Sequence, residues 1–263
     1  MSLTDPQIAL LAERVDTAAL SRAPIAKLTN EFPGMDWEDA YAIQHRLKQR
    51  VEARGQDCRL LFKAGLTSHA KMEQMGVKEP VFGFLQPDGQ VANGGSVAAD
   101  KFIHPRVEAE IALRLKAPLK GPDCRIEDVL AATGEVLVAL EIIDSRFENF
   151  NFDLKSVIAD NTSAAGWVIG EPVTYAPDLD LIDCAIELSR NGELAETATG
   201  AAVLGHPALS VAMLANLLSR RGEELPAGAL ILTGGASAAI AVNAGDRIDL
   251  KIDGLGALCV TFD

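Results

Sequence analysis

The chain has 263 residues and a formal net charge of −13, with 48% hydrophobic but only 5% aromatic residues. This length accommodates one large domain, or a main domain with a small one, on a largely aliphatic core. An acidic surface repels phosphate backbones and anionic lipid, so we expect no nucleic-acid and no membrane partner. An anionic metabolite would likewise need a local cation or a metal ion at its binding site.

No targeting or redox motif is evident in the sequence. The early apolar residues are interrupted by Glu13, Arg14 and Asp16, and we find no 18-residue apolar run of the kind that spans a membrane. The cysteines form no CxxC pair, which argues against a structural zinc site. We expect a cytoplasmic protein whose thiols are small core residues: Cys58, Cys124, Cys184 and Cys259.

The N-terminal part is predicted to be helical. Apolar residues recur at helical spacing from Ile8 to Val15, and Pro24 ends this pattern. A second helix is predicted to begin after Asp36, a favourable N-cap, and to end before Gly55. We therefore expect a small, mainly helical N-terminal domain over residues 1–75.

The remainder, residues 76–263, is predicted to be a β-rich, metal-binding catalytic domain, so that the fold class is α+β. One helix is indicated with Pro207 in its first turn and Gly222 beyond its end. The last strands are expected to form a meander. Apolar runs bounded by turn residues predict strands over 107–113, 136–143, 185–189, 230–232, 238–242, 247–252 and 257–262.

Three glutamates carry the strongest chemical signal. Glu108 and Glu110 alternate in a predicted strand and therefore share one face. If that face is solvated, the pair has no special meaning. Glu141, however, lies inside an apolar run typical of a buried central strand. A buried carboxylate must be protonated, paired or bound to metal, because leaving it unpaired costs several kcal/mol.

If Glu141 reaches the face of Glu108 and Glu110, the natural ligand is a hard divalent cation, Mg²⁺ or Mn²⁺. No His or Cys stands at ligand spacing to favour zinc, and His104 reads as an ordinary polar residue beside a turn. Lys63 lies in another apolar run. It either extends to the surface or lines a polar cavity, where it would bind an anion and assist proton transfer.

Six segments, by their order and spacing, resemble the fumarylacetoacetate hydrolase superfamily, in particular its branch of 2-oxo acid hydratases and decarboxylases. The resemblance implies a β-rich body of layered and rolled mixed sheet beside the small N-terminal domain. The segments are KAGLTS from Lys63, HPRVEAE from His104, EIIDSR from Glu141, ADNTS from Ala159, GHP from Gly205 and ILTGG from Ile231.

The same resemblance implies roles for individual side chains. Glu108, Glu110 and Glu141 match the family's magnesium or manganese ligands, and Lys63 matches a lysine of the substrate pocket. The positions implied to contact the substrate are Ser68, Ser163 and Thr233.

The implied activity is the metal-dependent decarboxylation of 4-oxalocrotonate (2-oxohex-3-enedioate) in aromatic meta-cleavage catabolism, by a homo-oligomer that associates with a hydratase. Hydratases of this branch usually carry an acidic residue at the position of Val81, whose apolar side chain cannot take a proton from water. Two alternatives remain open: hydration of 2-hydroxypenta-2,4-dienoate, and a non-catalytic, metal-binding partner subunit of a hydratase. The segments closer to the decarboxylases are 29–33, 144–150 and 210–217.

Overall fold

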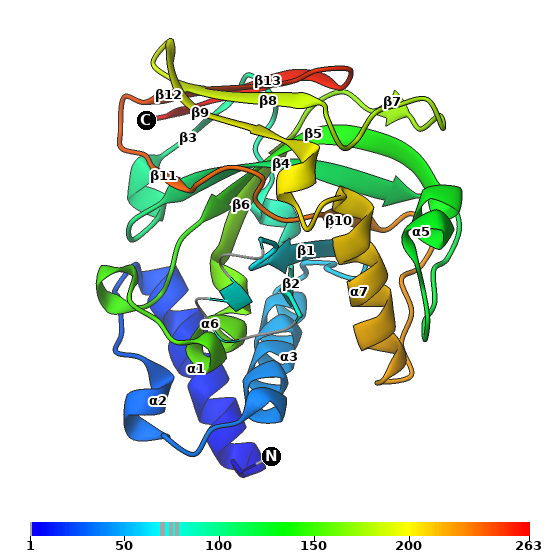
Figure 1. Cartoon of the computed structure of the whole chain (residues 1–263). Helices are drawn as coiled ribbons and strands as arrows, with labels where there is room; N and C mark the ends of the chain where they lie inside the picture. The colour runs from blue at the N-terminus through cyan, green and yellow to red at the C-terminus, as the bar shows by residue number, and fades with distance from the viewer. Residues whose placement is uncertain (1, 69–71, 74–75, 77–78) are drawn as a thin grey trace.

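The computed structural model of the chain describes residues 2–68, 72–73, 76 and 79–263. Two β-sheets lie one above the other, with helices packed below and beside the larger sheet (Figure 1). The fold is therefore α+β, with a β-rich body of layered, curled sheet and a helical N-terminal region, as predicted. The helices are α1 (Asp5–Ser21), α2 (Leu28–Glu31), α3 (Trp37–Ala53), α5 (Ile126–Ala132), α6 (Leu154–Ala159) and α7 (Pro207–Ser219).

The N-terminal helices form where the sequence predicted them. The apolar faces of α1 and α3 pack against each other in one cluster that also includes residues of α6. The carboxylate of Asp36 accepts a hydrogen bond from the backbone N–H of Asp39 at 2.8 Å and so caps the start of α3. Arg22 ends α1 in a left-handed conformation, before the predicted stop at Pro24.

Within the described residues, the larger sheet has eight strands in the order β2-β1-β10-β4-β5-β6, with β11 beside β4 and β7 beside β5. β1 and β10 are parallel, and the other neighbours are antiparallel. The strands are β1 (Leu61–Gly65), β2 (Val81–Phe84), β4 (Arg106–Leu115), β5 (Thr133–Ile143), β6 (Ala164–Ile169), β7 (Val173–Thr174), β10 (Leu230–Leu232) and β11 (Ile240–Ala241).

The second sheet has the order β3-β13-β12-β8-β9. The predicted C-terminal meander was wrong, because β10 and β11 belong to the larger sheet. The segment between them runs along β4, where the N–H groups of Thr233 and Ala236 donate to Ile111 and Ala109. The strands of this sheet are β3 (Ser96–Val97), β8 (Ala185–Arg190), β9 (Glu193–Thr199), β12 (Arg247–Ile252) and β13 (Gly256–Phe262).

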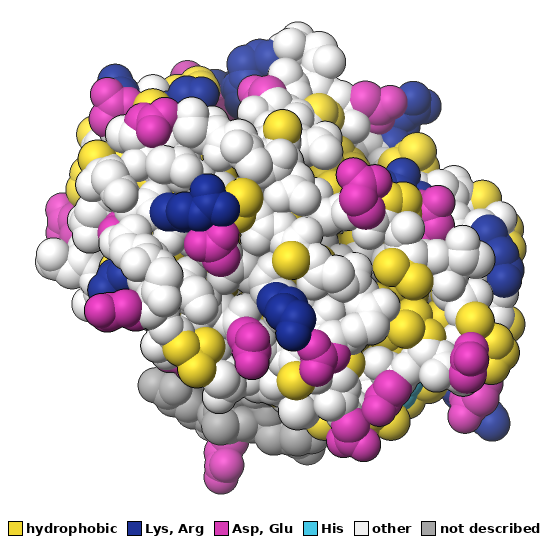
Figure 2. Space-filling view, turned by 90° about the horizontal axis from the view of Figure 1, so that it is seen from above, with side chains coloured by type: hydrophobic (Ala, Val, Ile, Leu, Met, Phe, Trp, Pro, Cys, Tyr) yellow, Lys and Arg dark blue, Asp and Glu magenta, His cyan; other side chains and the backbone are white. Residues whose placement is uncertain are grey.

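The main core fills the space between the two sheets. Val107, Ala109 and Ile111 of β4 are fully buried there together with residues of β12 and β13. Because side chains alternate along a strand, the glutamates of β4 lie on the opposite face of the sheet. On the outer side, seen from above, Figure 2 shows acidic and basic side chains interspersed, with small hydrophobic groups between them. On this face the acidic side chains do not form one continuous negatively charged patch.

One expectation from the sequence was wrong in detail. The segment Gly200–Ser219 is long and apolar enough to cross a membrane by length and composition, although none was expected. Half of that segment is buried, and its helix α7 packs against α5 and β1 as part of the main core. Its apolar character is therefore explained by the interior of the fold. Of the four thiols expected in the core, those of Cys58, Cys124 and Cys184 are buried, whereas that of Cys259 is only partly buried.

The division into domains at residues 75 and 76 stays a prediction. β1 lies within the first range but pairs with β10 and β2 in the larger sheet. Residues on both sides of that division therefore contribute to the sheet that carries the site.

Candidate active site

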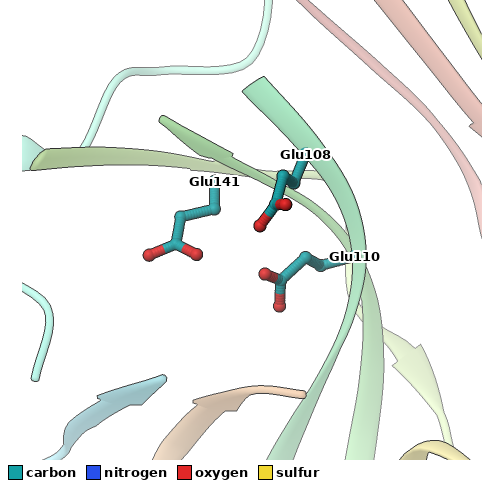
Figure 3. Close-up of side chains that lie close together, drawn as sticks. All are labelled: Glu108, Glu110 and Glu141. Atoms are coloured by element: carbon teal, nitrogen blue, oxygen red, sulfur yellow. The ribbon is translucent and has the colours of Figure 1, made fainter. Parts of the chain in front are cut away.

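Three carboxylates from two neighbouring strands point toward one another (Figure 3). In the antiparallel register of β4 and β5, Glu108 stands directly opposite Glu141, and Glu110 follows on the same face of β4. One oxygen from each side chain lies within 4.8 Å of the other two. Glu110 and Glu141 are fully buried and Glu108 is 9% exposed, which excludes the solvated face considered from the sequence.

Lys63, on β1, supplies a positive charge to this cluster. Its Nζ lies 3.1 Å from Oε2 of Glu141 and donates a hydrogen bond of 3.2 Å to the backbone carbonyl of Thr162. The side chain is only 3% exposed, so Lys63 does not extend to the surface. Burial of an ammonium ion is tolerated here because an opposite charge and a carbonyl oxygen contact it.

Counted over the described residues, the cluster carries more negative than positive charge. Burial, and secondarily the nearby charge of Glu141, raises the pKa of Glu110 well above its usual range, although Lys63 opposes the shift. Burial likewise raises the pKa of Glu141 to about 7, against the opposing effect of Lys63. One ammonium does not neutralise even the two fully buried carboxylates, those of Glu110 and Glu141, in a space that excludes water. Protons or a cation must balance the remainder.

The donor atoms fit a divalent metal ion. Among the described residues, no hydrogen-bond partner reaches Oε1 of Glu110 or Oε1 of Glu141. Buried oxygens are ordinarily satisfied, so these two positions require a ligand. The group contains carboxylates and no His or Cys, the oxygen set that Mg²⁺ and Mn²⁺ prefer.

A glycine pair after β10 closes around the carboxylates. The backbone N–H of Gly234 donates to Oε2 of Glu110 at 2.6 Å. A Cβ added at Gly235 would lie 2.8 Å from Cδ of Glu108, and one at Gly234 would lie 2.1 Å from Oγ1 of Thr67. Only glycine allows this approach. Sequence reasoning gave the pair no role at the metal site; two glycines directly after a strand are the signal that points to a close contact.

The three predicted substrate-binding residues occupy different positions around this cluster. Thr233 directly precedes the glycine pair, but its Oγ1 donates to the carbonyl of Ile111 at 2.8 Å. Ser163 is buried, and its hydroxyl donates to Asp160 at 3.5 Å. Ser68 is partly buried, shortly after β1. Contact of these hydroxyls with substrate stays a prediction.

The turn Asn161–Ser163 holds the carbonyl that contacts the ammonium. Its residues have φ angles of 51°, 53° and 60°, a run of left-handed conformations that is costly without glycine. The side-chain amide of Asn161 pairs with the backbone of Phe84, accepting at 2.9 Å and donating at 2.8 Å. Thr162 Oγ1 is buried without a hydrogen-bond partner among the described residues. Sequence reasoning missed Asn161 and Thr162, because the group that contacts Lys63 is a backbone carbonyl.

A buried ion pair anchors the start of this turn. The guanidinium of Arg146 contacts the carboxylate and the carbonyl of Asp160, and its Nη1 donates to the carbonyl of Asp144 at 2.5 Å. Burial raises the pKa of Asp160 to about 6, with Arg146 opposing the shift. The pair therefore fixes the segment that carries Thr162.

Known proteins are similar to this chain over nearly its whole length. Residues 59–263 match the family model for fumarylacetoacetate (FAA) hydrolase C-terminal. Over 261 residues the chain is 49% identical to a 4-oxalocrotonate decarboxylase from Pseudomonas putida, covering 99% of this chain and 98% of that protein. It is 39% identical over 252 residues to a 2-hydroxyhexa-2,4-dienoate hydratase from Comamonas testosteroni, covering 95% of each.

A solved structure of a relative is also similar to this chain over its whole length. The 4-oxalocrotonate decarboxylase from Pseudomonas putida G7, complexed with magnesium and adipate, has a TM-score of 0.96 and 47% sequence identity to this chain. The match covers 100% of this chain and 99% of that one. By sequence and by fold, this chain belongs to the fumarylacetoacetate hydrolase family.

Proposed function

We propose that the protein is a magnesium-dependent carboxy-lyase that converts 4-oxalocrotonate into 2-hydroxypenta-2,4-dienoate and CO₂. The observation that carries this proposal is the full-length similarity, at 49% identity, to a 4-oxalocrotonate decarboxylase. The buried cluster of Glu108, Glu110, Glu141 and Lys63 supports it, because it offers oxygens for a cation and an ammonium beside them.

The reaction breaks the bond between C5 and C6 of the substrate. The electron pair moves through the C3–C4 double bond onto the 2-oxo oxygen, and the distal carboxylate leaves as CO₂. When bound, Mg²⁺ supplies a Lewis acid that stabilises negative charge on the substrate. In this scheme Glu108, Glu110 and Glu141 hold the cation in a site that excludes bulk water.

Lys63 has two tasks in this scheme. Its ammonium attracts the anionic substrate and holds a proton close to the developing enolate. The contacts with Thr162 and Glu141 orient Nζ before the substrate arrives, so that little reorganisation is needed during the reaction. Ser68, Ser163 and Thr233 are proposed to contact the substrate at the edges of this cluster.

A hydratase is the alternative that an observation favours. The chain is also 39% identical to a 2-hydroxyhexa-2,4-dienoate hydratase, and the released dienol is itself a hydratase substrate. The buried, apolar side chain of Val81 argues against a hydratase, because this position carries no acidic group that could activate water. A non-catalytic partner subunit has no evident use for a buried lysine beside the three carboxylates.

We further propose that the protein acts in the cytoplasm as a homo-oligomer, in contact with a hydratase. Cysteines without disulfides support a reducing compartment. A contact with the hydratase would pass the unstable dienol directly to the next enzyme.

The test incubates the purified protein with Mg²⁺ and 4-oxalocrotonate and records CO₂ release and the NMR spectrum of the product. We expect stoichiometric CO₂ and the dienol, both abolished by a chelator and restored by Mg²⁺. Hydration of 2-hydroxypenta-2,4-dienoate without CO₂ release would favour the hydratase. Absence of any turnover, together with activation of an added hydratase, would favour the partner subunit.

A further inference from the structure

Two nitrogen-bearing side chains pack on one aromatic ring at the start of β4. The guanidinium carbon of Arg106 lies 4.5 Å from the ring centroid of Phe150. The ring of His104 packs on the same phenyl group, with 5.1 Å between centroids. An aromatic face attracts a cation and holds a guanidinium plane in place. The ring therefore fixes two potential donors in one small region.

This region shares its sheet face with the carboxylates. Arg106, Glu108 and Glu110 alternate along β4, and the pairing with β5 has no register shift over this stretch. Their side chains therefore leave the strand on the same side. At the rise of a β-strand, Arg106 begins about 7 Å from Glu108 along the strand. A ligand that reaches the triad with one end can extend toward Arg106 with the other.

Both donors have unused hydrogen-bonding capacity. Among the described residues, no carboxylate forms an ion pair with Arg106, whereas Arg14, Arg114 and Arg220 each pair with a glutamate. Nε2 of His104 is buried and has no hydrogen-bond partner in the described part of the chain. In a protein with a net charge of −13, a partly buried arginine without an acidic partner is available for an external anion.

We propose that Arg106, assisted by His104, binds the second carboxylate of a dicarboxylic substrate whose 2-oxo acid end lies at the glutamate triad. This inference rests on the proposed function and adds the group that selects diacids over monoacids. A guanidinium offers a planar pair of N–H groups that matches a carboxylate in two parallel hydrogen bonds. Lys63 serves the end at the triad, so the two carboxylates have separate cations.

The arrangement also suits the departure of CO₂. While the C5–C6 bond is intact, the guanidinium holds the carboxylate and limits rotation about that bond. When the bond breaks, the electron pair moves to the 2-oxo oxygen and the leaving fragment becomes neutral. Arg106 then has no anion to retain.

The experiment measures binding, with no requirement for turnover. Calorimetry with Mg²⁺-loaded protein compares adipate, a six-carbon diacid, with hexanoate, which has one carboxylate. The wild-type protein should prefer adipate. In Arg106→Met we expect adipate affinity to fall roughly 10- to 100-fold, with hexanoate affinity unchanged. Arg106→Lys keeps the positive charge but lacks the planar pair of N–H groups. This variant should retain part of the preference for adipate.

Arg114→Met is the matched control, because Arg114 lies on the same strand and pairs instead with Glu135 at 3.0 Å. This variant should keep the preference for adipate. Unchanged Mg²⁺ affinity and thermal midpoint in Arg106→Met would show that the triad and the fold are intact. A wild-type protein without preference, or an Arg106→Met variant that keeps it, overturns the inference. An Arg106-dependent preference in a protein that does not decarboxylate 4-oxalocrotonate would contradict the proposed reaction and leave this subsite standing.

Discussion

Glu108 on β4 stands directly opposite Glu141 on β5, so that two carboxylates face each other across one antiparallel pair. Like charges in this position destabilise a sheet even when it is solvated. Here Glu141 is fully buried, and the ammonium of Lys63 lies 3.1 Å from its Oε2. Stability alone does not explain such a pair. Ligand binding does.

Glu141→Gln should abolish metal-dependent turnover and weaken Mg²⁺ binding by at least roughly 100-fold, since even losses outside the metal's direct ligands cost 10- to 100-fold. Calorimetric titration with Mg²⁺ and CO₂ release are the measurements. Glu135→Gln is the matched control, because Glu135 lies on the same strand but is only partly buried and paired with Arg114. Normal Mg²⁺ affinity in Glu141→Gln would remove this residue from the metal site.

Lys63→Met should lower turnover without weakening Mg²⁺ binding. Loss of the ammonium removes the proton held near the enolate, so turnover should fall roughly 10²- to 10⁴-fold. Mg²⁺ should bind at least as tightly, because a positive charge next to the carboxylates is gone. Steady-state kinetics and calorimetry check the two expectations. Lys48→Met, at a lysine that packs over Phe62 and Phe84, should change neither, and near-normal turnover in Lys63→Met would leave Lys63 without a catalytic role.

Mg²⁺ affinity should depend on pH. Because burial raises the pKa of Glu141 to about 7 and that of Glu110 well above its usual range, these carboxylates hold protons in acid. A cation must displace those protons, so affinity should fall as the pH falls through about 7, by up to about tenfold per pH unit for each proton released. Titrations in two buffers with different ionisation enthalpies count the protons. Equal affinity at pH 5.5 and pH 8 would contradict this expectation.

The same pKa shifts determine whether the free energy of unfolding of the metal-free protein rises or falls with pH. Glu110, Glu141 and Asp160 all have a pKa that burial raises, so the folded chain binds more protons than the unfolded chain between their ordinary range and about 7. The contribution of these groups to the free energy of unfolding therefore decreases as the pH rises through that interval. Thermal unfolding at pH 5 and pH 7.5 should show the decrease, and Mg²⁺ should offset it at the higher pH. A carboxylate cluster that is more stable when ionised would give the opposite slope.

The sequence predicted the carboxylates of the site but not its geometry. Alternation placed Glu108 on a definite strand face, and the apolar run around Glu141 indicated burial. Their direct opposition depends on the register between strands, which alternation does not encode. Thr162 contributes a backbone carbonyl, and Gly234 contributes a backbone N–H. Every residue has the first group, and every residue except proline has the second. Their role follows from conformation, and residue identity alone does not reveal it.

Val81→Asp tests the choice between decarboxylation and hydration. Cγ2 of Val81 and Nζ of Lys63 each lie 3.4 Å from the place that a Cβ at Gly65 would take, so Val81 lies beside the ammonium. An aspartate there would pair with Lys63 and could accept a proton from water. We expect the variant to gain measurable hydration of 2-hydroxypenta-2,4-dienoate, monitored by loss of diene absorbance. Val81→Asn, isosteric but without a basic group, should gain none; equal rates for both would mean that the apolar side chain does not set the reaction.

Asn161→Ala tests whether the left-handed turn positions Lys63. The substitution removes both hydrogen bonds to Phe84 and places alanine at a φ of 51°, where asparagine is better tolerated. Two buried groups left unpaired should lower the free energy of unfolding by about 2–4 kcal/mol. Because the carbonyl of Thr162 would shift away from Nζ, turnover should fall roughly 10- to 100-fold.

Asn161→Gly provides the comparison, since glycine accepts the left-handed conformation but also lacks the amide. It should lose the same hydrogen bonds with less backbone strain, and therefore retain more turnover than Asn161→Ala. The amide of Asn161 is bonded to the backbone of Phe84, so a loss of turnover at unchanged Mg²⁺ affinity would act through the turn, which positions Lys63 and carries Ser163. A lower melting temperature with full turnover in both variants would restrict the turn to a structural role.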